Sequence, residues 1–554
     1  MSFATEDEDE GSSSSENVRR ARAPLPERVD VAIVGSGLGG LVAAAYLARS
    51  GLRVAVLEAH YVAGGCATVF TRKTDLGRYH FDVGLHYIGD CEENGAIPSI
   101  LRDVGTRVEF SRLDPEGFDT LVFPDLEFRI PVDLDLYRER LVGLFPSEKR
   151  GIDRYLKLLR AVQKAGEKMD GGKVRLGDAA SLAFDLYGLA RNQSRTIGEF
   201  LDDCTKEPRL RAILLGQSGD YGLPPSKVSA FLHLGLSAHY FKGAYYTKGG
   251  GQVIADRLVE VIEANGGSVH LRSPVERILI ENGRAVGVRV AGRRAFPARE
   301  LRADLVLSNA DLKRTLLELV GPEHLPSGWV EKTKGFEMAA AIFLTFLGVK
   351  GDLRQRGMRA SNYWQFDSYD MEGFYADPKP GQPIVPHGCY ITSASLKDPE
   401  NAAHHAPPGV QSLEVMTVVP SGVGHWGVSE SDAERWKYKH DERYHQVKQR
   451  LEDDMIARLD RLFPGTAADI VFRESSTPAS HTRYTRATAG TGYGIAATPE
   501  QFLRNRPGYR GPIPGLYLSG ASTRAGHGIV GAMMSGREAA KRIAKDLGKT
   551  LPKG

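Results

Sequence analysis

The chain has 554 residues, which is too long for one simple core and predicts two to four structural units at about 100–200 residues per domain. Hydrophobic residues make up 42% of the chain and charged residues 25%, a balance that excludes a wholly disordered, collagenous or coiled-coil protein. Because 72 Lys and Arg face 69 Asp and Glu, the net charge of +3 argues against a dedicated nucleic-acid-binding protein.

The N-terminal segment combines the acidic run 6–10 with the serine run 12–15, and because no basic stretch followed by an apolar stretch is visible, we expect no secretory leader. This composition predicts a disordered tail over residues 1–28. Four arginines in that segment are expected to form a solvated linker rather than a lipid-binding patch: Arg19, Arg20, Arg22 and Arg28.

The most apolar stretch, residues 31–48, is interrupted by glycines, so we expect a buried strand and helix there rather than a membrane span. A soluble, cytoplasmic protein is expected, and peripheral contact with a membrane surface remains compatible with the sequence. The four cysteines have no CxxC spacing, which predicts reduced thiols, and we expect no metal site.

A glycine cluster follows the first predicted strand. Residues 30–34 form a short apolar run, and Gly35, Gly37 and Gly40 follow it in GxGxxG spacing. Gly35 permits a tight turn, Gly37 lets the main chain approach a pyrophosphate, and Gly40 lets the next helix pack on the strand. That helix is predicted over residues 41–49, and its N-terminus offers free N–H groups to the phosphates.

A second buried strand, residues 53–57, ends at Glu58, which lies 18 residues after Gly40. Its carboxylate is placed to accept hydrogen bonds from the adenosine ribose hydroxyls. Strand, glycines, helix, strand and acid occur in the order of a dinucleotide-binding βαβ unit, which makes this combination far more specific than the glycines alone.

The segment after Glu58 favours FAD over NAD. The pair Gly64-Gly65 and the run FDVG at 81–84, after the glycine cluster and the acid, resemble the phytoene desaturase, carotenoid isomerase and amine oxidase superfamily. The resemblance implies an α/β fold, in which a Rossmann-type FAD-binding domain of the amine-oxidase-like kind is interleaved with an α+β substrate domain. It also implies that the main chain at Val275 touches the adenine.

The C-terminal region carries another glycine cluster, PGLYLSGASTRAGHGIVGAMMSG, with a strand predicted over 516–519 and a helix from Ile529. This segment resembles the second FAD motif of the superfamily, in which the start of the last helix points its N–H groups at the flavin. By that resemblance we expect contacts from Gly520, Ala521, Gly528 and Ile529. Many members carry Asp where this chain has Ala521, and too few residues follow Gly531 for a second dinucleotide unit.

Four further segments resemble the retinol saturase branch of this superfamily: FDVGLHYIG, GGC at 64–66, GLPP through KGAYY at 222–246, and GIAATPEQF at 494–502. The expected domain division places residues 29–100, 249–312 and 485–547 in the FAD-binding domain. Residues 101–248 and 313–484 then form the substrate-binding domain.

The resemblance implies an FAD-dependent oxidoreductase acting on a C=C bond of a hydrophobic small molecule, such as a retinoid, carotenoid or unsaturated lipid. The first hypothesis is an enzyme that saturates all-trans-retinol or a related polyene. The alternative is a carotenoid or fatty-acid isomerase or desaturase, and the third hypothesis is a non-catalytic lipid-binding flavoprotein. Saturation needs a proton, and His86, Tyr87 and Tyr246 are the candidate donors, His86 first because imidazole side chains commonly exchange protons near neutral pH. Core packing is the competing interpretation for all three, and the sequence does not indicate the electron donor.

Overall fold

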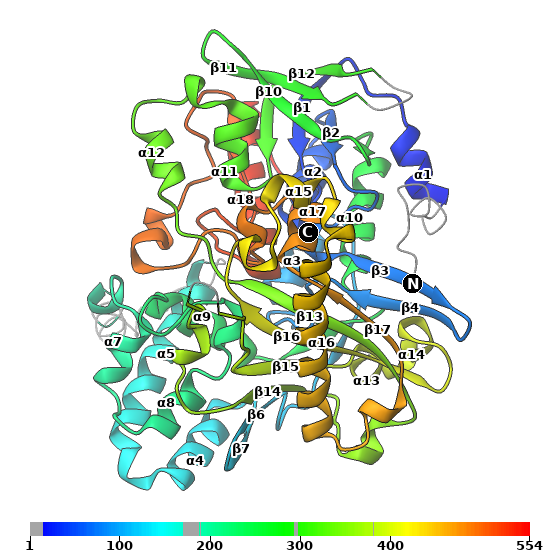
Figure 1. The fold of residues 1–554 in the computed structure, drawn as a ribbon. Coiled ribbons are helices and arrows are strands. Elements are labelled where there is room, and N and C mark those ends of the chain that lie inside the picture. The colour runs from blue at the N-terminus through cyan, green and yellow to red at the C-terminus, as the bar shows by residue number, and fades with distance from the viewer. Residues whose placement is uncertain (1–14, 170–187, 189, 293–296, 380–381, 554) are drawn as a thin grey trace.

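The computed structural model describes residues 15–169, 188, 190–292, 297–379 and 382–553. Two large sheets organise the chain, one in the upper half of Figure 1 and one in the lower half. Several segments run between these halves, so that residues far apart in sequence share each sheet. The interleaved α/β arrangement is the fold class predicted from the sequence.

The first sheet has the order β10–β11–β12–β1–β2–β9, and β18 also pairs with β12. The segments β9, β2, β1, β12 and β18 are parallel, whereas β10 and β11 form an antiparallel extension. The strand bounds are β1 (Arg28–Val34), β2 (Val54–Leu57), β9 (Ser268–His270), β10 (Val275–Glu281), β11 (Arg284–Val290), β12 (Arg299–Ser308) and β18 (Leu516–Leu518).

Three helices form a layer against this sheet. The helix α2 (Leu38–Arg49) lies between α10 (Gln252–Ala264) and α18 (Gly528–Asp546). The backbones of α2 and α18 approach very closely, because a Cβ at Gly536 would lie 2.2 Å from the carbonyl oxygen of Gly39. Glycine at this crossing therefore sets how α18 docks on α2.

The second sheet has the order β17–β13–β16–β15–β14–β6–β7, and α16 (Glu442–Leu462) packs on β13, β15 and β16 (Figure 1). Two of its strands, β6 and β7, come from a region whose sequence favours helices. The strand bounds are β6 (Asp119–Phe123), β7 (Leu126–Ile130), β13 (Ala341–Lys350), β14 (Asn362–Phe366), β15 (Gly388–Thr392), β16 (Val410–Val419) and β17 (Ile470–Ser476).

Helices flank the second sheet at the lower left of Figure 1: α4 (Leu134–Leu144), α5 (Lys149–Met169), α7 (Ile197–Asp202), α8 (Pro208–Leu214) and α9 (Ala230–Tyr240). The remaining helices are short: α3 (Ala96–Asp103), α11 (Leu312–Arg314), α12 (Trp329–Lys334), α13 (Ala394–Lys397), α14 (Ala402–His405), α15 (Glu430–Glu434) and α17 (Pro478–Thr485).

A two-stranded hairpin connects the halves. Its strands are β3 (Val69–Thr74) and β4 (Gly77–Asp82), and a second small pair joins β5 (Phe110–Arg112) to β8 (Tyr245–Thr247). The rings of Phe70 and Phe81 contact Phe346 on β13, with centroids 4.7 and 5.3 Å apart respectively. Aromatic packing therefore fixes the hairpin on the second sheet.

The predicted N-terminal tail is wrong in part. Residues 1–14 lie outside the described residues, but Ser15–Arg22 form α1. The guanidinium of Arg20 is 8% exposed and pairs with Glu263 of α10 at 2.9 Å, and Arg19 pairs with the same carboxylate at 3.0 Å. These arginines belong to a docked helix rather than a solvated linker, because a charge on α10 holds them.

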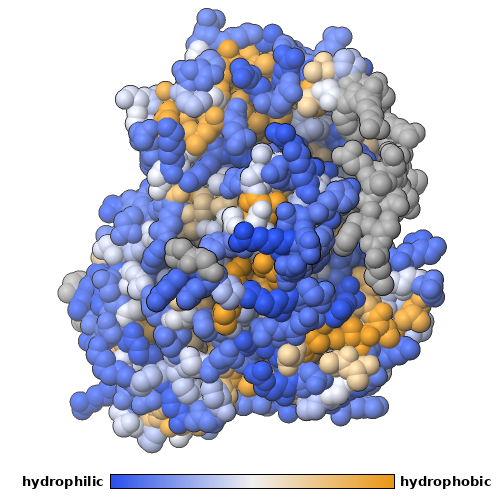
Figure 2. Space-filling model, viewed as in Figure 1, coloured by the Kyte–Doolittle hydropathy of each residue, from blue (hydrophilic) through white to orange (hydrophobic). Residues whose placement is uncertain are grey.

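Figure 2 shows a face that is largely hydrophilic, with apolar side chains gathered at the lower right near β17 and the β3–β4 hairpin. Leu76, in the turn of that hairpin, is 47% exposed. In the described part of the chain, we find no helix with the length and apolar character needed to cross a membrane.

Candidate functional site

The site begins at one edge of the first sheet. Because β1, β2, β12 and β18 are parallel, the residues that follow them meet at the same edge: Gly35, Glu58, Asn309 and Gly520. Gly35 and Gly520 have φ angles of 89° and 95°, which glycine adopts without the penalty that a Cβ brings. The two glycine clusters, 485 residues apart in sequence, are therefore adjacent in the fold.

Two helices begin at this edge without a capping side chain. Gly37 is the N-cap of α2 and His527 is the N-cap of α18, and neither first turn contains an acidic residue. Free main-chain N–H groups and the positive end of each helix dipole therefore remain available to an anion. Uncapped helix starts of this kind suit a phosphate-bearing ligand and the negative charge of a reduced flavin.

Asn309 connects the two clusters and was missed by the sequence analysis. Its side chain accepts a hydrogen bond from Ser519 at 3.0 Å. A Cβ on Gly37 would lie 2.7 Å from its amide nitrogen, and a Cβ on Gly520 would lie 3.1 Å from its amide oxygen. The available signal was its position at the end of the apolar run 305–307, since strand ends carry ligand-facing residues in such sheets.

The Gly64-Gly65 pair packs against the first cluster. The Gly64 N–H donates to the carbonyl of Ser36 at 3.0 Å, and a Cβ on Gly65 would lie 3.0 Å from the Cα of Gly37. Gly64 and Gly65 have φ angles of 134° and 60°. Side chains larger than hydrogen would therefore separate these two turns.

The Glu58 carboxylate is held in place by three donors. Its Oε2 accepts from the main-chain N–H of Ser36 at 2.8 Å and from the Ser36 hydroxyl at 2.6 Å, and its Oε1 accepts from the His60 N–H at 2.8 Å. A carboxylate has about four acceptor sites, so at least one remains for a ribose hydroxyl. The acid is thus oriented before a ligand binds.

A single cavity of about 2180 Å³ joins these features. That volume exceeds the roughly 300–1,000 Å³ of an ordinary small-molecule pocket and leaves room for a dinucleotide and a second molecule. Gly40 does not line it; a Cβ there would meet the Gly35 carbonyl at 2.4 Å, which places Gly40 in helix–strand packing. All other expected cofactor residues line it: Gly35, Gly37, Glu58, Gly64, Gly65, Val275, Gly520, Ala521, Gly528 and Ile529.

Aromatic side chains line the cavity where it reaches the second sheet: Phe70, Phe346, Phe472, Tyr484 and Tyr493. Phe346 is 3% exposed and Phe70 packs edge-on against it. The hydroxyl of Tyr493 donates to the carbonyl of Gly219 at 2.7 Å, which fixes that ring. An apolar, rigid wall of this kind suits a flat hydrophobic molecule.

His86 lies two residues beyond the cavity-lining segment 83–84 and does not itself line the cavity. Its Nδ1 is 2.9 Å from a carboxylate oxygen of Glu414 on β16, and its side chain is 12% exposed against 2% for Glu414. A carboxylate at Nδ1 selects the tautomer and orientation of the ring. The Nε2 atom is left as the one that could exchange a proton with a ligand.

The hydroxyl of Tyr87 contacts two buried carboxylates, and Tyr87 does not line the cavity. Its hydroxyl lies 2.7 Å from Asp220 and 3.1 Å from Asp119. Burial raises the pKa of Asp220 to about 8 and that of Asp119 to about 6, so Asp220 is largely protonated at neutral pH. The protonated Asp220 and the Tyr87 hydroxyl each carry one hydrogen, so both contacts of the tyrosine, with Asp220 and with Asp119, can be hydrogen bonds.

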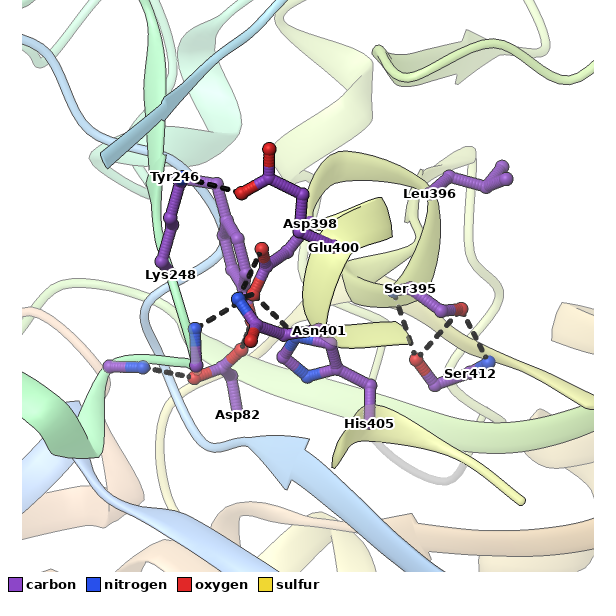
Figure 3. A network of polar contacts seen from close by, with 12 residues as sticks. Asp82, Tyr246, Lys248, Ser395, Leu396, Asp398, Glu400, Asn401, His405 and Ser412 are labelled. Carbon is purple, nitrogen blue, oxygen red and sulfur yellow. Dashed lines mark hydrogen bonds and ion pairs between the residues drawn. The ribbon is translucent and has the colours of Figure 1, made fainter. Parts of the chain in front are cut away.

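Tyr246 lies in a polar network at the junction of the two halves, also away from the cavity (Figure 3). Its buried hydroxyl donates to Asp82, whose other oxygen accepts from the Gly251 N–H at 2.8 Å. In the same view, Asp398 accepts from the Gly249 N–H at 2.7 Å and contacts His405 at 3.1 Å. Tyr246 thus holds the Gly-rich segment 249–251 against β4.

Arg506 is a further residue that the sequence analysis missed. It is 1% exposed and donates to the carbonyls of Ile495 at 2.9 Å and Ala521 at 2.7 Å. Burial lowers its pKa to about 9. It ties the segment 494–502 to the second glycine cluster, whereas its place in a loop of ordinary composition gave no signal.

Acidic, histidine and cysteine side chains do not gather anywhere in the described ranges into a group of three or more able to hold a metal ion. The chemistry of the lining instead suits a dinucleotide: glycines where a Cβ would intrude, two free helix starts and a preoriented acid.

Comparison with known proteins agrees with this geometry. The model of the family described as flavin containing amine oxidoreductase matches residues 38–544. All-trans-retinol 13,14-reductase from Danio rerio is 28% identical over 531 residues, covering 90% of this chain and 83% of the relative. Prolycopene isomerase from Daucus carota is 28% identical over 536 residues, covering 94% and 80%.

Solved structures share the fold at low sequence identity. An oxidoreductase from Methanosarcina mazei superposes with a TM-score of 0.59 and 18% identity, covering 92% of this chain and 99% of the other. Putrescine oxidase bound to putrescine gives a TM-score of 0.58 and 16% identity, covering 94% and 99%.

Proposed function

Because the chain belongs to the flavin-containing amine oxidoreductase family, it is an FAD-dependent enzyme of the retinol reductase and carotenoid isomerase type, and we propose that it saturates a C=C bond of all-trans-retinol or a related polyene. We also propose that the first sheet belongs to the FAD-binding domain, residues 29–100, 249–312 and 485–547. The second sheet then belongs to the substrate domain, residues 101–248 and 313–484.

One observation carries this proposal. The cavity that starts at the glycine clusters continues between Phe70, Phe346 and Phe472. A conjugated polyene is flat and apolar, so its burial between aromatic rings gains about 25 cal/mol for each Å² of apolar surface removed from water.

When bound, FAD supplies the redox chemistry of the reaction, the exchange of hydride with a substrate carbon. The residues of the chain hold the cofactor, orient the substrate and shield the reacting carbons from water. Gly35, Gly37 and Glu58 hold the adenosine and diphosphate end, while Gly520 follows β18 and Gly528 begins α18. The aromatic wall keeps water from the reacting carbons.

We propose His86 as the proton source of the saturation step. Because Nδ1–H faces Glu414, Nε2 carries a proton only in the imidazolium form of His86, and this form would give it to the carbon adjacent to the one that receives hydride. Since the His86 ring does not line the cavity, the transfer would pass through a bridging water. Tyr87 and Tyr246 are assigned positioning roles instead, because their hydroxyls are engaged by Asp220 and Asp82 respectively.

The alternative is isomerisation of a carotenoid, and the similarity to prolycopene isomerases favours it over other rivals. The two reactions use the same cofactor and the same apolar wall. They differ in net electron transfer, since saturation gives two electrons to the substrate and isomerisation gives none overall.

Incubation of the purified protein, anaerobically and with its flavin reduced, tests both proposals. All-trans-retinol and a carotene are supplied separately, and products are separated by chromatography with mass detection. A product heavier by two hydrogens supports saturation, and an unchanged mass with a new retention time supports isomerisation. Absence of either product, with FAD bound, would contradict both polyene proposals. The Gly37→Val variant without FAD serves as the matched control.

A further inference from the structure

Arg314 and Arg486 line the cavity that Glu58 also lines, and Arg483 lies close enough to repel Arg486. Of these three arginines, only Arg486 lacks a side-chain partner within the described residues. Arg314 forms an ion pair with Glu434, and Arg483 donates to the Glu434 carbonyl at 2.9 Å. The guanidinium of Arg486 makes no hydrogen bond or ion pair with any residue among those that the structure describes. The charge of Arg486 is therefore not engaged in a direct contact, although carboxylates lie nearby.

The surroundings of Arg486 disfavour its charge. Burial lowers the pKa of Arg486 first, and repulsion from Arg314 and Arg483 lowers it further, against attraction from Glu58 and Glu318. The Glu58 carboxylate already accepts three hydrogen bonds. An anion placed among these arginines would remove the repulsion, which is the arrangement of a binding site rather than of a structural ion pair.

The main chain presents Arg486 to the cavity in a fixed way. Arg486 is the residue after α17 and has φ 54° and ψ 29°, a left-handed conformation that is costly for a residue with a Cβ. Its N–H donates to the Thr482 carbonyl at 3.1 Å, and Thr488 donates to Asp311 at 2.7 Å from its hydroxyl. The segment is therefore tied to the end of β12, beside Asn309.

The ligand class follows from what else lines this region. The diphosphate of a dinucleotide carries two negative charges, and it lies between the ribose acid and the helix start in such sites. The first glycine cluster offers main-chain N–H groups there, and Cys66, after the Gly64-Gly65 pair, offers a thiol. The neighbouring turns thus bring no cationic side chain of their own.

We propose that Arg486 binds the diphosphate of FAD and supplies the cation that the glycine turns do not. This proposal depends on the cofactor of the family and not on the polyene substrate. A matched control is Lys73, which lines the same cavity from β3 and whose ammonium group likewise forms no ion pair or hydrogen bond within the described residues.

The test uses full-length Arg486→Gln, Arg486→Lys and Lys73→Gln proteins. We measure the FAD-to-protein ratio as purified, the rate of FAD release from the holoprotein, and calorimetric binding of ADP and of adenosine to the full chain after FAD removal. Since a charge-assisted hydrogen bond contributes strongly, we expect Arg486→Gln to weaken ADP binding about 10- to 100-fold and to speed FAD release. Adenosine binding should change less than about twofold, Arg486→Lys should restore part of the loss, and Lys73→Gln should match the wild type.

Equal weakening of ADP and adenosine would overturn the proposal, because a distorted site and not a lost phosphate contact would then explain it. Unchanged ADP binding would overturn it as well and would leave Arg486 to an acidic group on another molecule. Thermal unfolding of each variant identifies a general loss of fold. No polyene enters these measurements, so a negative saturation assay and a negative result here remain distinguishable.

Discussion

Two glycines three residues apart in the first cluster are expected to fail in different ways when a side chain is added. A Cβ on Gly40 would lie 2.4 Å from the main-chain carbonyl oxygen of Gly35. That oxygen cannot rotate away, so Gly40→Ala must push α2 off β1. A Cβ on Gly37 would meet only the side-chain amide of Asn309, at 2.7 Å, which can turn.

The expected loss for Gly40→Ala follows from two opposing effects. Overpacking against a fixed backbone costs about 2–3 kcal/mol, at the upper end of the usual range. Replacing a helical glycine by alanine returns about 1 kcal/mol. The net loss of about 1–2 kcal/mol corresponds to a fall in Tm of about 2–8 °C for a cooperative unit of this size. Gly37→Val should leave the Tm of the FAD-free protein nearly unchanged.

Calorimetric melting of FAD-free proteins, together with the FAD-to-protein ratio as purified, separates the two effects. Gly37→Val should lose FAD, because its side chain occupies the approach to the diphosphate. Gly40→Ala should keep the capacity to bind FAD at temperatures where it is folded. A Gly37→Val protein with a full FAD complement would refute the assignment of this cluster, and a Gly40→Ala protein with wild-type Tm would refute the packing argument.

Three further predictions follow from single contacts. His86→Ala should lower the rate of polyene saturation about 10²–10⁴-fold without loss of FAD, and Glu414→Gln should lower it less while shifting the pH profile; an unchanged rate for both would remove His86 from the chemistry. Burial raises the pKa of Asp220 to about 8, so the protonated carboxyl stabilises the fold at low pH and this contribution is lost as pH rises from about 4 to 8. The Asp220→Asn variant lacks this pH dependence. The difference in Tm, variant minus wild type, should therefore increase over that window in melting curves. Arg20→Ala should cost about 1 kcal/mol and speed tryptic cleavage near α1, since the pair with Glu263 is partly buried; identical digestion would show that α1 is not held by it.

The elements of the cofactor half could be predicted because their signals are local. The strands over 30–34 and 53–57 and the helix between them are short-range patterns, and the structure confirms them as β1, β2 and α2. The Asn282-Gly283 pair is a local signal of the same kind, since this dipeptide is typical of a two-residue hairpin turn, and it joins β10 to β11 with φ angles of 50° and 71°. Each of these depends on neighbours within a few residues.

The contacts that complete the site could not be predicted because they join distant segments. Asn309 meets Gly37 and Gly520 only after β12 has been inserted beside β1, and Arg506 meets Ala521 only once both loops are placed. Arg486 has no motif of its own and faces the cavity because α17 ends in a left-handed residue. Neither periodicity nor spacing records such long-range pairings.

Tyr87 and Tyr246 show that a motif in the sequence can also suggest a role that the contacts in the structure do not support. Both occur in segments that resemble the retinol saturase branch, and a motif residue near a flavin invites a catalytic role. Their hydroxyls instead contact Asp220 and Asp82, deep inside the chain. A segment can therefore be characteristic of a family because it builds the junction that the site depends on.

That junction explains why so much charge is buried between the halves. Lys397 is 4% exposed, donates to the main-chain carbonyl of His86 and lies 4.7 Å from the centroid of the Tyr246 ring. Burial lowers its pKa to about 8, while attraction to Glu414 and Asp82 opposes that shift. A buried ion network of this kind adds little net stability, but it is costly to break by a single substitution. It therefore holds the His86 backbone and ring in one geometry relative to both sheets, which a reaction between a bound cofactor and a bound polyene requires.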